Sequence, residues 1–245
     1  MTATPFAPPI KCQGIKTRLT DWIRDVAVTA DHSRWVEPFA GSCAVSLNLR
    51  PEHALLCDTN PHLVHFYRSV QAGRVSPESV RAFLEEEGQR LLDEGEAHYY
   101  LIRERFNASC AGPDGAGDPH DFLFLNRACF NGMIRFNRSG GFNVPFCRKP
   151  ARFSPAYVTR IVNQVARTRD LVASRDWEFR CQPFETTLAQ TTADDFVYCD
   201  PPYAGRHTDY FNCWTDEDDA DLAARLADSP APFILSTWHH NVHRH

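Results

Sequence analysis

The sequence predicts an α/β protein with a doubly wound, Rossmann-like parallel sheet, into which a mostly helical domain with a β-hairpin is inserted. Three observations support this fold class. Strand-like apolar segments alternate with helical patterns at both ends of the chain, a glycine turn follows the first predicted strand, and a carboxylate ends the second. Ligands of such sheets bind at the carboxyl ends of the strands, where both features lie.

The predicted elements follow one another in a regular order. A strand over 33–39 leads into a turn and a helix that ends near Leu49, and a strand over 53–57 ends on Asp58 before Pro61 opens a helix to about residue 72. The further elements are helices at 77–92, 97–106, 155–174 and 216–228, a loop at 111–118, extended segments at 134–138 and 142–146 that indicate a hairpin around 139–141, and strands at 177–181, 196–199 and 233–237. Residues 1–60 and 155–245 are therefore expected to build the sheet domain, and 61–154 the insertion.

The composition excludes several classes of protein. With 43% hydrophobic and 23% charged residues, the 245-residue chain is neither disordered nor fibrous. No apolar run approaches the roughly 18 residues of a membrane span, and the start lacks the pattern of a signal peptide, so we expect a cytoplasmic protein. The nine cysteines are odd in number and form no C-x-x-C pair, which predicts reduced thiols and no metal site.

Positive charge is concentrated in one region although the net charge is −5. Residues 122–169 contain no Asp or Glu, and their cations are Arg127, Arg135, Arg138, Arg148, Lys149, Arg152, Arg160, Arg167 and Arg169. Phenylalanines at 124, 130, 136, 142 and 146 are interleaved with them. This mixture is typical of nucleic-acid surfaces, where cations contact phosphates and rings stack on bases. A solvated basic helix is the simpler alternative.

The turn after the first strand, EPFAG at 37–41, predicts a nucleoside pocket together with Asp58. Gly41 allows the backbone to approach a ligand closely, and Asp58 at the end of the second strand can accept hydrogen bonds from two ribose hydroxyls. The pattern alone does not separate a nicotinamide cofactor from S-adenosylmethionine, although the G-x-G-x-x-G fingerprint of dinucleotide sites is missing.

The tetrapeptide Asp200-Pro201-Pro202-Tyr203, directly after the strand at 196–199, is more specific. Two prolines cannot continue a strand ladder, so they turn the chain off the sheet and fix the direction of the Asp200 carboxylate and the Pro201 carbonyl. These acceptors fit the two N–H groups of an exocyclic amine on a planar base that stacks on Tyr203. They favour the pyramidal amine whose lone pair points outward, and therefore help most in the transition state of an attack by that amine.

These motifs belong to a collinear set that resembles the Dam-like DNA adenine methyltransferases, the alpha group or D12 class. The set comprises IKCQGIK at 10–16, EPFAGS at 37–42, CDTNP at 57–61, YYLIRERFN at 99–107, FLNRACFNGMIRFN at 124–137, GFNVPF at 141–146 and VYCDPPY at 197–203. The resemblance implies S-adenosylmethionine as cofactor, bound by the sheet domain, and a helical target-recognition insertion. It places Lys11, Lys16, Glu37, Phe39, Gly41, Asp58, Phe184 and Asp200 at cofactor-binding positions, and Asp200, Pro201, Pro202 and Tyr203 at the catalytic site.

The resemblance also implies double-stranded DNA as the partner. The residues at its recognition positions are Arg127, Phe130, Asn131, Met133, Arg135, Asn137 and Arg138. Phe130 and Asn131 stand where the family fills the space left by a flipped base, and flipping is required because a stacked adenine cannot reach a buried methyl donor. Arg135 stands where the family reads a guanine, which makes a GATC-like target a lead; a phosphate contact is the alternative for this residue.

The sequence departs from the family at four positions. Cys12 and Ile15 replace an aromatic residue and a glycine, Cys43 replaces a common second glycine, and Pro183 stands where an Asp often bonds the adenine amine of the cofactor. We also expect further strands of the sheet beyond residue 237. The leading hypothesis is a monomeric enzyme that methylates the N6 amine of adenine in a short duplex target. N4-cytosine methylation and an inactive DNA-binding module are the alternatives.

Overall fold

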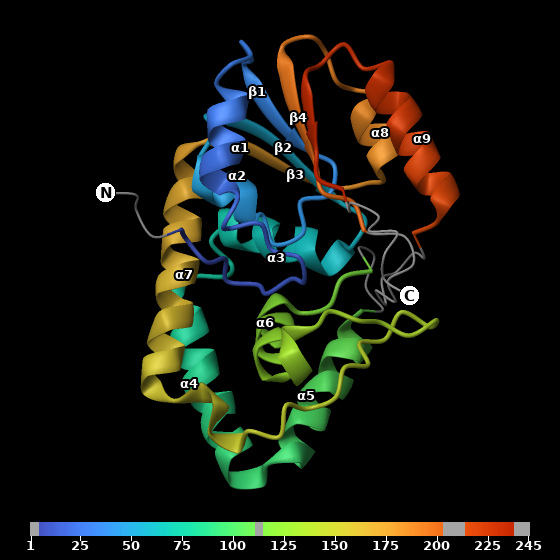
Figure 1. The fold of residues 1–245 in the computed structure, drawn as a ribbon. Helices are drawn as coiled ribbons and strands as arrows, with labels where there is room; N and C mark the ends of the chain where they lie inside the picture. Colours follow the sequence, from blue (N-terminus) through green and yellow to red (C-terminus); the bar gives the residue numbers. More distant parts are fainter. Residues whose placement is uncertain (1–4, 111–114, 203–213, 238–245) are drawn as a thin grey trace, which may run out of the picture.

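A computed structural model describes residues 5–110, 115–202 and 214–237, and it confirms the predicted α/β class (Figure 1). In the described chain, the centre is a parallel sheet with the strand order β3-β2-β1-β4-β5. The strands are β1 (Arg34–Glu37), β2 (His53–Asp58), β3 (Asp176–Cys181), β4 (Asp195–Cys199) and β5 (Phe233–Leu235). Val36 of β1 pairs with Leu55 on one side and with Val197 on the other. The strand order reverses between β1 and β4, which is where doubly wound sheets bind ligands.

Helices cover both faces of this sheet. Alternate strand residues point to opposite faces, so Trp35 and Phe196 pack into one hydrophobic cluster, whereas Val36 and Val197 pack into another. The first cluster includes residues of α1 (Thr20–Ala27), α2 (Ala44–Leu49), α3 (Pro61–Gln71) and α7 (Pro155–Ser174), and the second includes residues of α8 (Phe184–Leu188) and α9 (Asp216–Ala227). The result is the three-layer arrangement expected of this fold class.

The segment between β2 and α7 is mostly helical, as predicted. Its helices after α3 are α4 (Pro77–Glu94), α5 (Glu96–Ser109), α6 (Pro119–Ala128) and the short 3-10 helices η1 (Phe130–Gly132) and η2 (Pro150–Phe153). The first helix of the predicted insertion, α3, lies on the sheet: Tyr67 stacks on Phe179, and the Arg68 guanidinium donates to the Phe179 carbonyl at 2.8 Å. The division at residues 60 and 155 stays a prediction.

The predicted hairpin is present as two isolated antiparallel bridges instead of a regular ladder. Phe136 pairs with Phe142, and Cys129 pairs with Phe146. Asn137 closes the turn between them, because its side-chain oxygen accepts hydrogen bonds from the backbone N–H groups of Ser139 at 3.0 Å and Gly141 at 2.9 Å. This oxygen is thus used to hold the turn, while the predicted DNA contact of Asn137 stays untested.

Most of the phenylalanines that are interleaved with the cations belong to the hydrophobic core. This corrects the interpretation that their rings stack on nucleic-acid bases. The side chains of Phe124, Phe136, Phe142 and Phe146 are at most 8% exposed, whereas Phe130 is 51% exposed. These rings pack against other aromatic rings, as Phe124 does against Phe153 and Phe136 against Phe142. None of the described helices is both long and apolar enough to cross a membrane. The cysteines that the structure describes are all free thiols.

Candidate active site

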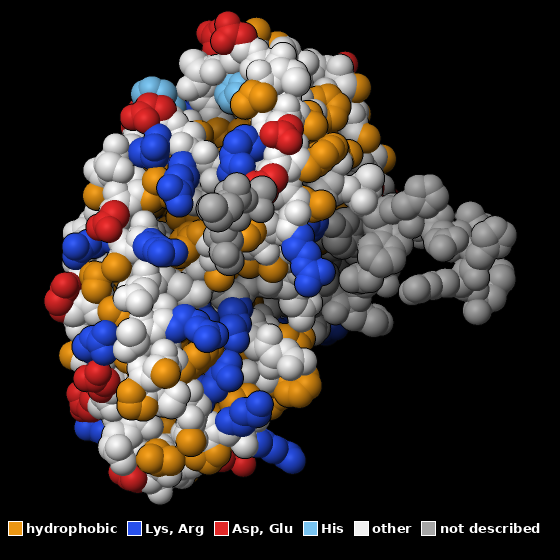
Figure 2. Space-filling view, turned by 60° about the vertical axis from the view of Figure 1, so that its left-hand side comes forward, with side chains coloured by type: hydrophobic (Ala, Val, Ile, Leu, Met, Phe, Trp, Pro, Cys, Tyr) orange, Lys and Arg blue, Asp and Glu red, His pale blue; other side chains and the backbone are white. Residues whose placement is uncertain are grey.

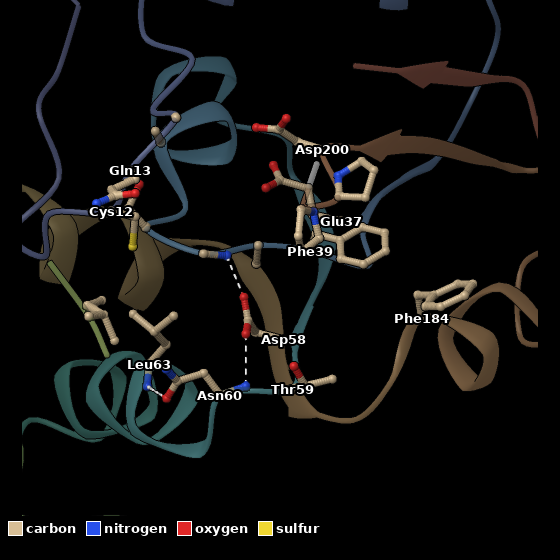
Figure 3. Close-up of a pocket in the computed structure, with 18 of the residues that line it drawn as sticks. Cys12, Gln13, Glu37, Phe39, Asp58, Thr59, Asn60, Leu63, Phe184 and Asp200 are labelled. Atoms are coloured by element: carbon tan, nitrogen blue, oxygen red, sulfur yellow. Dashed lines mark hydrogen bonds between the residues drawn. The ribbon is translucent and has the colours of Figure 1, made fainter. Parts of the chain in front are cut away.

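One cavity joins the two motifs that predict binding. It has a volume of about 400 Å³, and its wall includes the Gly41 turn, Asp58 and the corner formed by Asp200, Pro201 and Pro202 (Figure 3). These residues follow β1, β2 and β4, so the reversal of the strand order brings them together. Tyr203, the fourth residue of the predicted corner, lies outside the described residues.

Asp58 is held at the end of β2 by the backbone. Its Oδ2 accepts a hydrogen bond from the N–H of Gly41 at 2.8 Å, and its Oδ1 accepts one from the N–H of Asn60 at 2.8 Å, as drawn in Figure 3. Gly41 has a φ of 51°, in the left-handed region that favours glycine. Burial raises the pKa of Asp58, and the backbone N–H groups oppose this rise. Each carboxylate oxygen has two lone pairs, so both can accept a further donor such as a hydroxyl.

Glu37 is a buried carboxyl group beside the corner. Its side chain is 2% exposed, and its Oε1 accepts hydrogen bonds from the Trp35 indole N–H at 2.8 Å and from the Ser46 hydroxyl. Burial raises the pKa of Glu37 to about 7, against the effect of both hydrogen bonds, and the charge of Asp200 adds to the rise. Figure 3 shows the Glu37 and Asp200 side chains next to each other. The site therefore contains a carboxyl group that titrates near neutral pH.

Lys16 lines the cavity and also contacts the carboxylate of Asp200. Its Nζ lies 2.7 Å from both oxygens of Asp200 and also donates to the Gly14 carbonyl at 2.8 Å. The two side chains of the ion pair are 15% and 20% exposed, so solvent screens this pair less than an ion pair on the open surface. Lys16 thus connects the early motif to the corner after β4.

Three aromatic side chains pack together in another part of the cavity wall, and we call them the aromatic cluster: Phe39, Phe184 and Trp214. The ring centroids of Phe39 and Phe184 are 5.5 Å apart, and Trp214 lies 5.4 Å from Phe39 and 5.5 Å from Phe184. The Trp214 indole N–H donates to Asp219 at 2.6 Å. Phe39 and Phe184 line the cavity, and their contact with a cofactor stays a prediction. The sequence did not single out Trp214, since it lies outside every motif.

Glu185 is a second residue that the sequence did not single out. It lines the cavity directly after Phe184, in the first turn of α8. Its Oε2 is shielded from solvent and has no hydrogen-bond partner among the described residues. The only signal in the sequence is an acidic residue next to a predicted cofactor contact.

Lys11 is predicted to bind the cofactor, but it is not among the residues that line the cavity, and its role stays a prediction. Asn126 holds the Lys11 backbone from both sides, accepting from its N–H at 2.8 Å and donating to its carbonyl at 2.9 Å. The Lys11 ammonium lies 6.0 Å from the centre of the Tyr157 ring. The side chain is therefore directed to α7 and away from the cavity.

The predicted recognition residues divide between the cavity and the surface. Met133 lines the cavity, and Phe130 and Asn131 precede it as exposed side chains. Asn143 holds Arg135 from across the hairpin, because its side-chain oxygen accepts from Nε at 2.7 Å and its carbonyl accepts from Nη2 at 3.1 Å. This stretch of chain therefore borders the cavity.

Arg127 is buried in this structure, although the sequence predicts it as a DNA contact. Its side chain is 3% exposed, and its guanidinium donates to the carbonyls of Pro8 and Pro9 and to Gln164 at 2.7 Å. Burial lowers the pKa of Arg127. The cations that remain exposed are Arg138, Arg148 and Lys149 near the hairpin and Arg160 and Arg167 on α7. Figure 2 shows Lys and Arg side chains distributed over the face that carries α7.

Comparison with known proteins agrees with the geometry of the cavity. A family model described as D12 class N6 adenine-specific DNA methyltransferase matches residues 13–244. The chain is 36% identical over 197 residues to the retron Ec67 DNA adenine methylase of Escherichia coli, a match that covers 79% of this chain and 63% of that protein. It is 32% identical to the DNA adenine methylase of Vibrio cholerae over 85% of this chain and 73% of that protein, and 31% identical to that of Serratia marcescens over 93% and 82%.

The chain thus spans somewhat less than two thirds of the retron protein and more of the other two. In the part of the chain that the structure describes, no group of three or more His, Cys, Asp or Glu side chains could hold a metal ion. The collinear motifs, the parallel sheet and the match over nearly the whole length lead to one conclusion: the chain belongs to the D12 class of N6 adenine-specific DNA methyltransferases.

Proposed function

We propose that this protein transfers a methyl group from S-adenosylmethionine to the N6 amine of adenine in a short duplex DNA target. The observation that carries the proposal is the single cavity shared by the Gly41 turn, Asp58 and the Asp200 corner. A methyl donor held near Asp58 and an amine held at Asp200 would meet inside it. Membership of the D12 class favours adenine over cytosine as the target base.

The residues of the cavity fit S-adenosylmethionine. The aromatic cluster offers flat surfaces for a nucleobase, Asp58 offers carboxylate oxygens for ribose hydroxyls, and the Glu185 Oε2 is a buried acceptor that lacks a donor among the described residues. When bound, this cofactor supplies a methyl group on a positively charged sulfur, which is a good electrophile. Protein nucleophiles are therefore not required.

Asp200 would act on the amine of the target base. Its carboxylate and the Pro201 carbonyl accept the two N–H groups, and the outward lone pair then points at the methyl group. A carboxylate has about four lone-pair sites, so Asp200 can accept the amine while it keeps the contact with Lys16. The amine must lose one proton as the new N–C bond forms, and the oxygen that already accepts its N–H is placed to receive it.

The recognition residues would hold DNA beside this site. Adenine must leave the helix to enter the cavity, and Phe130 and Asn131 are exposed next to Met133 in the cavity wall, where they could fill the vacated space. Asn143 fixes the orientation of the Arg135 guanidinium, which suits it for bidentate contact with a guanine. We therefore propose a target in which adenine neighbours guanine, such as GATC.

A transfer assay tests the proposal. Duplexes of varied sequence are incubated with cofactor that carries a tritiated methyl group, the labelled product is digested to nucleosides, and the mass of each nucleoside is measured. We expect N6-methyladenine. The proposal would be contradicted by N4-methylcytosine, or by the absence of transfer in a protein that binds the cofactor.

The variant Asp200→Ala separates catalysis from DNA binding. It should abolish transfer and leave most of the DNA affinity, because phosphate contacts supply that affinity. The matched control is Asp170→Ala, which removes an exposed acid of α7 outside the cavity and should retain transfer. An equal loss of transfer and DNA binding in Asp200→Ala would refute the role of Asp200.

A further inference from the structure

We propose that Glu185 and Trp214 read the nucleobase of the methyl donor, with the Glu185 carboxylate accepting a hydrogen bond from the exocyclic amine of its adenine. This inference rests on the proposed function, since it requires an adenine-containing donor. Neither residue belongs to the motifs quoted in the sequence analysis, and the residue before Phe184 is Pro183, whose side chain has no acceptor.

The first step is the state of the Glu185 carboxylate. Buried acceptors almost always have a donor, because a polar atom without one loses its hydration and gains nothing in return. The Glu185 Oε2 is shielded from solvent and has no donor among the described residues, and the side chain lines the cavity. An acceptor in this state at the wall of a ligand cavity indicates a donor that arrives with the ligand.

The second step is the position of this acceptor next to flat surfaces. Glu185 follows Phe184 in the chain, and Phe184 packs against Phe39 and Trp214. A ring that stacks in the aromatic cluster presents its edge, and hence an exocyclic amine, to a neighbouring carboxylate. Gln182 also carries an acceptor in this turn, but it does not line the cavity, and its amide donates to the Thr187 hydroxyl at 2.9 Å.

The third step is the spacing within the aromatic cluster. The centroids of Phe39 and Phe184 are 5.5 Å apart, whereas a ring between them would need about 7 Å, twice the usual contact distance of carbon atoms. A base that stacks between these two rings therefore has to part the aromatic cluster as it enters. Trp214 touches both rings, so the surroundings of its indole change when the base binds.

Calorimetry with two ligands tests the role of Glu185. S-adenosylhomocysteine carries the amine, and S-inosylhomocysteine carries an oxygen in its place. The native protein should bind the first at least about tenfold more tightly, as expected for a hydrogen bond to a charged acceptor. Glu185→Ala should bind both with equal affinity, and Glu185→Gln, which keeps an acceptor oxygen, should retain part of the preference. Glu217→Ala, which removes an exposed acid of α9, is the matched control and should keep the full preference.

The outcomes separate this inference from the proposed function. A native protein that binds neither ligand would refute the proposed function. A native protein that prefers the amine ligand, with the same preference in Glu185→Ala, would overturn only the role of Glu185. Thermal unfolding without ligand tests whether Glu185 has a merely structural role. Glu185→Ala should unfold at the same temperature as the native protein or at a higher one. A lower unfolding temperature, together with an equal loss of affinity for both ligands, would overturn the inference.

Fluorescence tests the role of Trp214. Adding S-adenosylhomocysteine to the native protein should change the tryptophan emission, and Trp214→Phe should lose this change and bind both ligands several-fold more weakly. Trp22→Phe is the control, since Trp22 is 57% exposed on α1 and outside the cavity, and it should keep the change. An unchanged response in Trp214→Phe would refute the part assigned to Trp214.

Discussion

Lys16 has two effects on the carboxylate that it contacts. With Nζ at 2.7 Å from both oxygens, it fixes the plane of the Asp200 carboxylate, and it places a positive charge beside that carboxylate. Lys16 is thus a positioning residue for the proposed catalysis. A role in orientation alone would lower the rate, whereas the electrostatic role also makes the rate depend on pH.

The variant Lys16→Met should slow methyl transfer at least about tenfold and shift the acidic limb of the pH profile to higher pH. Without the ammonium group, this part of the cavity loses a positive charge, and a nearby positive charge favours the ionised form of a carboxyl group. The measurement is kcat/KM between pH 5.5 and 9. Lys149→Met serves as the control, because Lys149 is exposed near the hairpin, and its loss should weaken DNA binding without moving the limb. If the acidic limb of Lys16→Met lies at the same pH as that of the native protein, Lys16 only orients the Asp200 carboxylate.

Glu37 makes stability depend on pH. Burial raises its pKa from 4.5 to about 7 in the folded protein. Below pH 4.5 the carboxyl is protonated in both states, whereas between pH 4.5 and 7 the unfolded chain releases the proton more readily. The free energy of unfolding therefore falls as the pH rises through this window, by up to about 3 kcal/mol.

Glu37→Gln should remove this loss, because the amide stays neutral and its oxygen can still accept from Trp35 and Ser46. In urea unfolding without ligand, the variant should gain stability over the native protein as the pH rises from 4.5 to 8, by about 3 kcal/mol at most. The exposed acid Glu217 provides the control variant Glu217→Gln, for which no such difference is expected. A constant difference between the native protein and Glu37→Gln across this range would show that Glu37 is ionised throughout.

At the scale of elements, helix boundaries were predictable where the capping chemistry is local. Pro61 opens α3 behind Asn60, whose side chain accepts from two N–H groups, and Pro155 opens α7, which spans the predicted residues 155–174. Helix α6 was missed because its sequence, PHDFLFLNRA, is buried nearly all round and shows no amphipathic period. Helix α8, with five residues, is too short for a periodic pattern.

The candidate site was predictable where strand ends determine it. Asp58 and Asp200 follow apolar strands, and parallel strands bring their carboxyl ends to the same edge. The contacts of Glu185, Trp214 and Arg127 depend on tertiary packing. Arg127 is one of nine cations in a stretch without acids, and nothing local shows that it turns inward to carbonyls more than 100 residues away.

The recognition stretch offers a matched pair of arginines, one held across the hairpin and one exposed in its turn. Arg135→Ala should relax the preference for guanine beside the target adenine, with a discrimination loss of about 1 to 3 kcal/mol. Arg138→Ala should weaken binding to all sequences similarly and reduce the salt dependence of the binding constant by about one unit of slope. Binding to duplexes substituted at one base, measured at several salt concentrations, distinguishes the two. If Arg135→Ala behaves like Arg138→Ala, Arg135 contacts phosphate.

At the scale of the whole molecule, the amino-terminal arm connects the helical region with the sheet domain. Phe6 pairs with Asn48 of α2 through hydrogen bonds in both directions, and Lys11 pairs with Asn126 of α6 in the same way. Between these points Arg127 binds the carbonyls of Pro8 and Pro9 and the Gln164 side chain on α7. Figure 1 shows this arm running from α7 past α3 and above α6. A buried guanidinium therefore helps to hold the arm between the helical region and α7.

Arg127→Ala should lower the free energy of unfolding by about 3 kcal/mol, because the carbonyls of Pro8 and Pro9 and the Gln164 oxygen lose their donor in a buried place. Arg127→Lys should recover little, since an ammonium group lacks the fork that reaches several acceptors at once. Urea unfolding measures both variants beside Arg160→Ala, an exposed arginine of α7 whose loss should change stability by less than about 0.5 kcal/mol. The folded fraction of Arg127→Ala should bind duplex DNA as the native protein does. Native stability combined with weakened DNA binding would instead make Arg127 a phosphate contact, as the charge pattern of the sequence suggests.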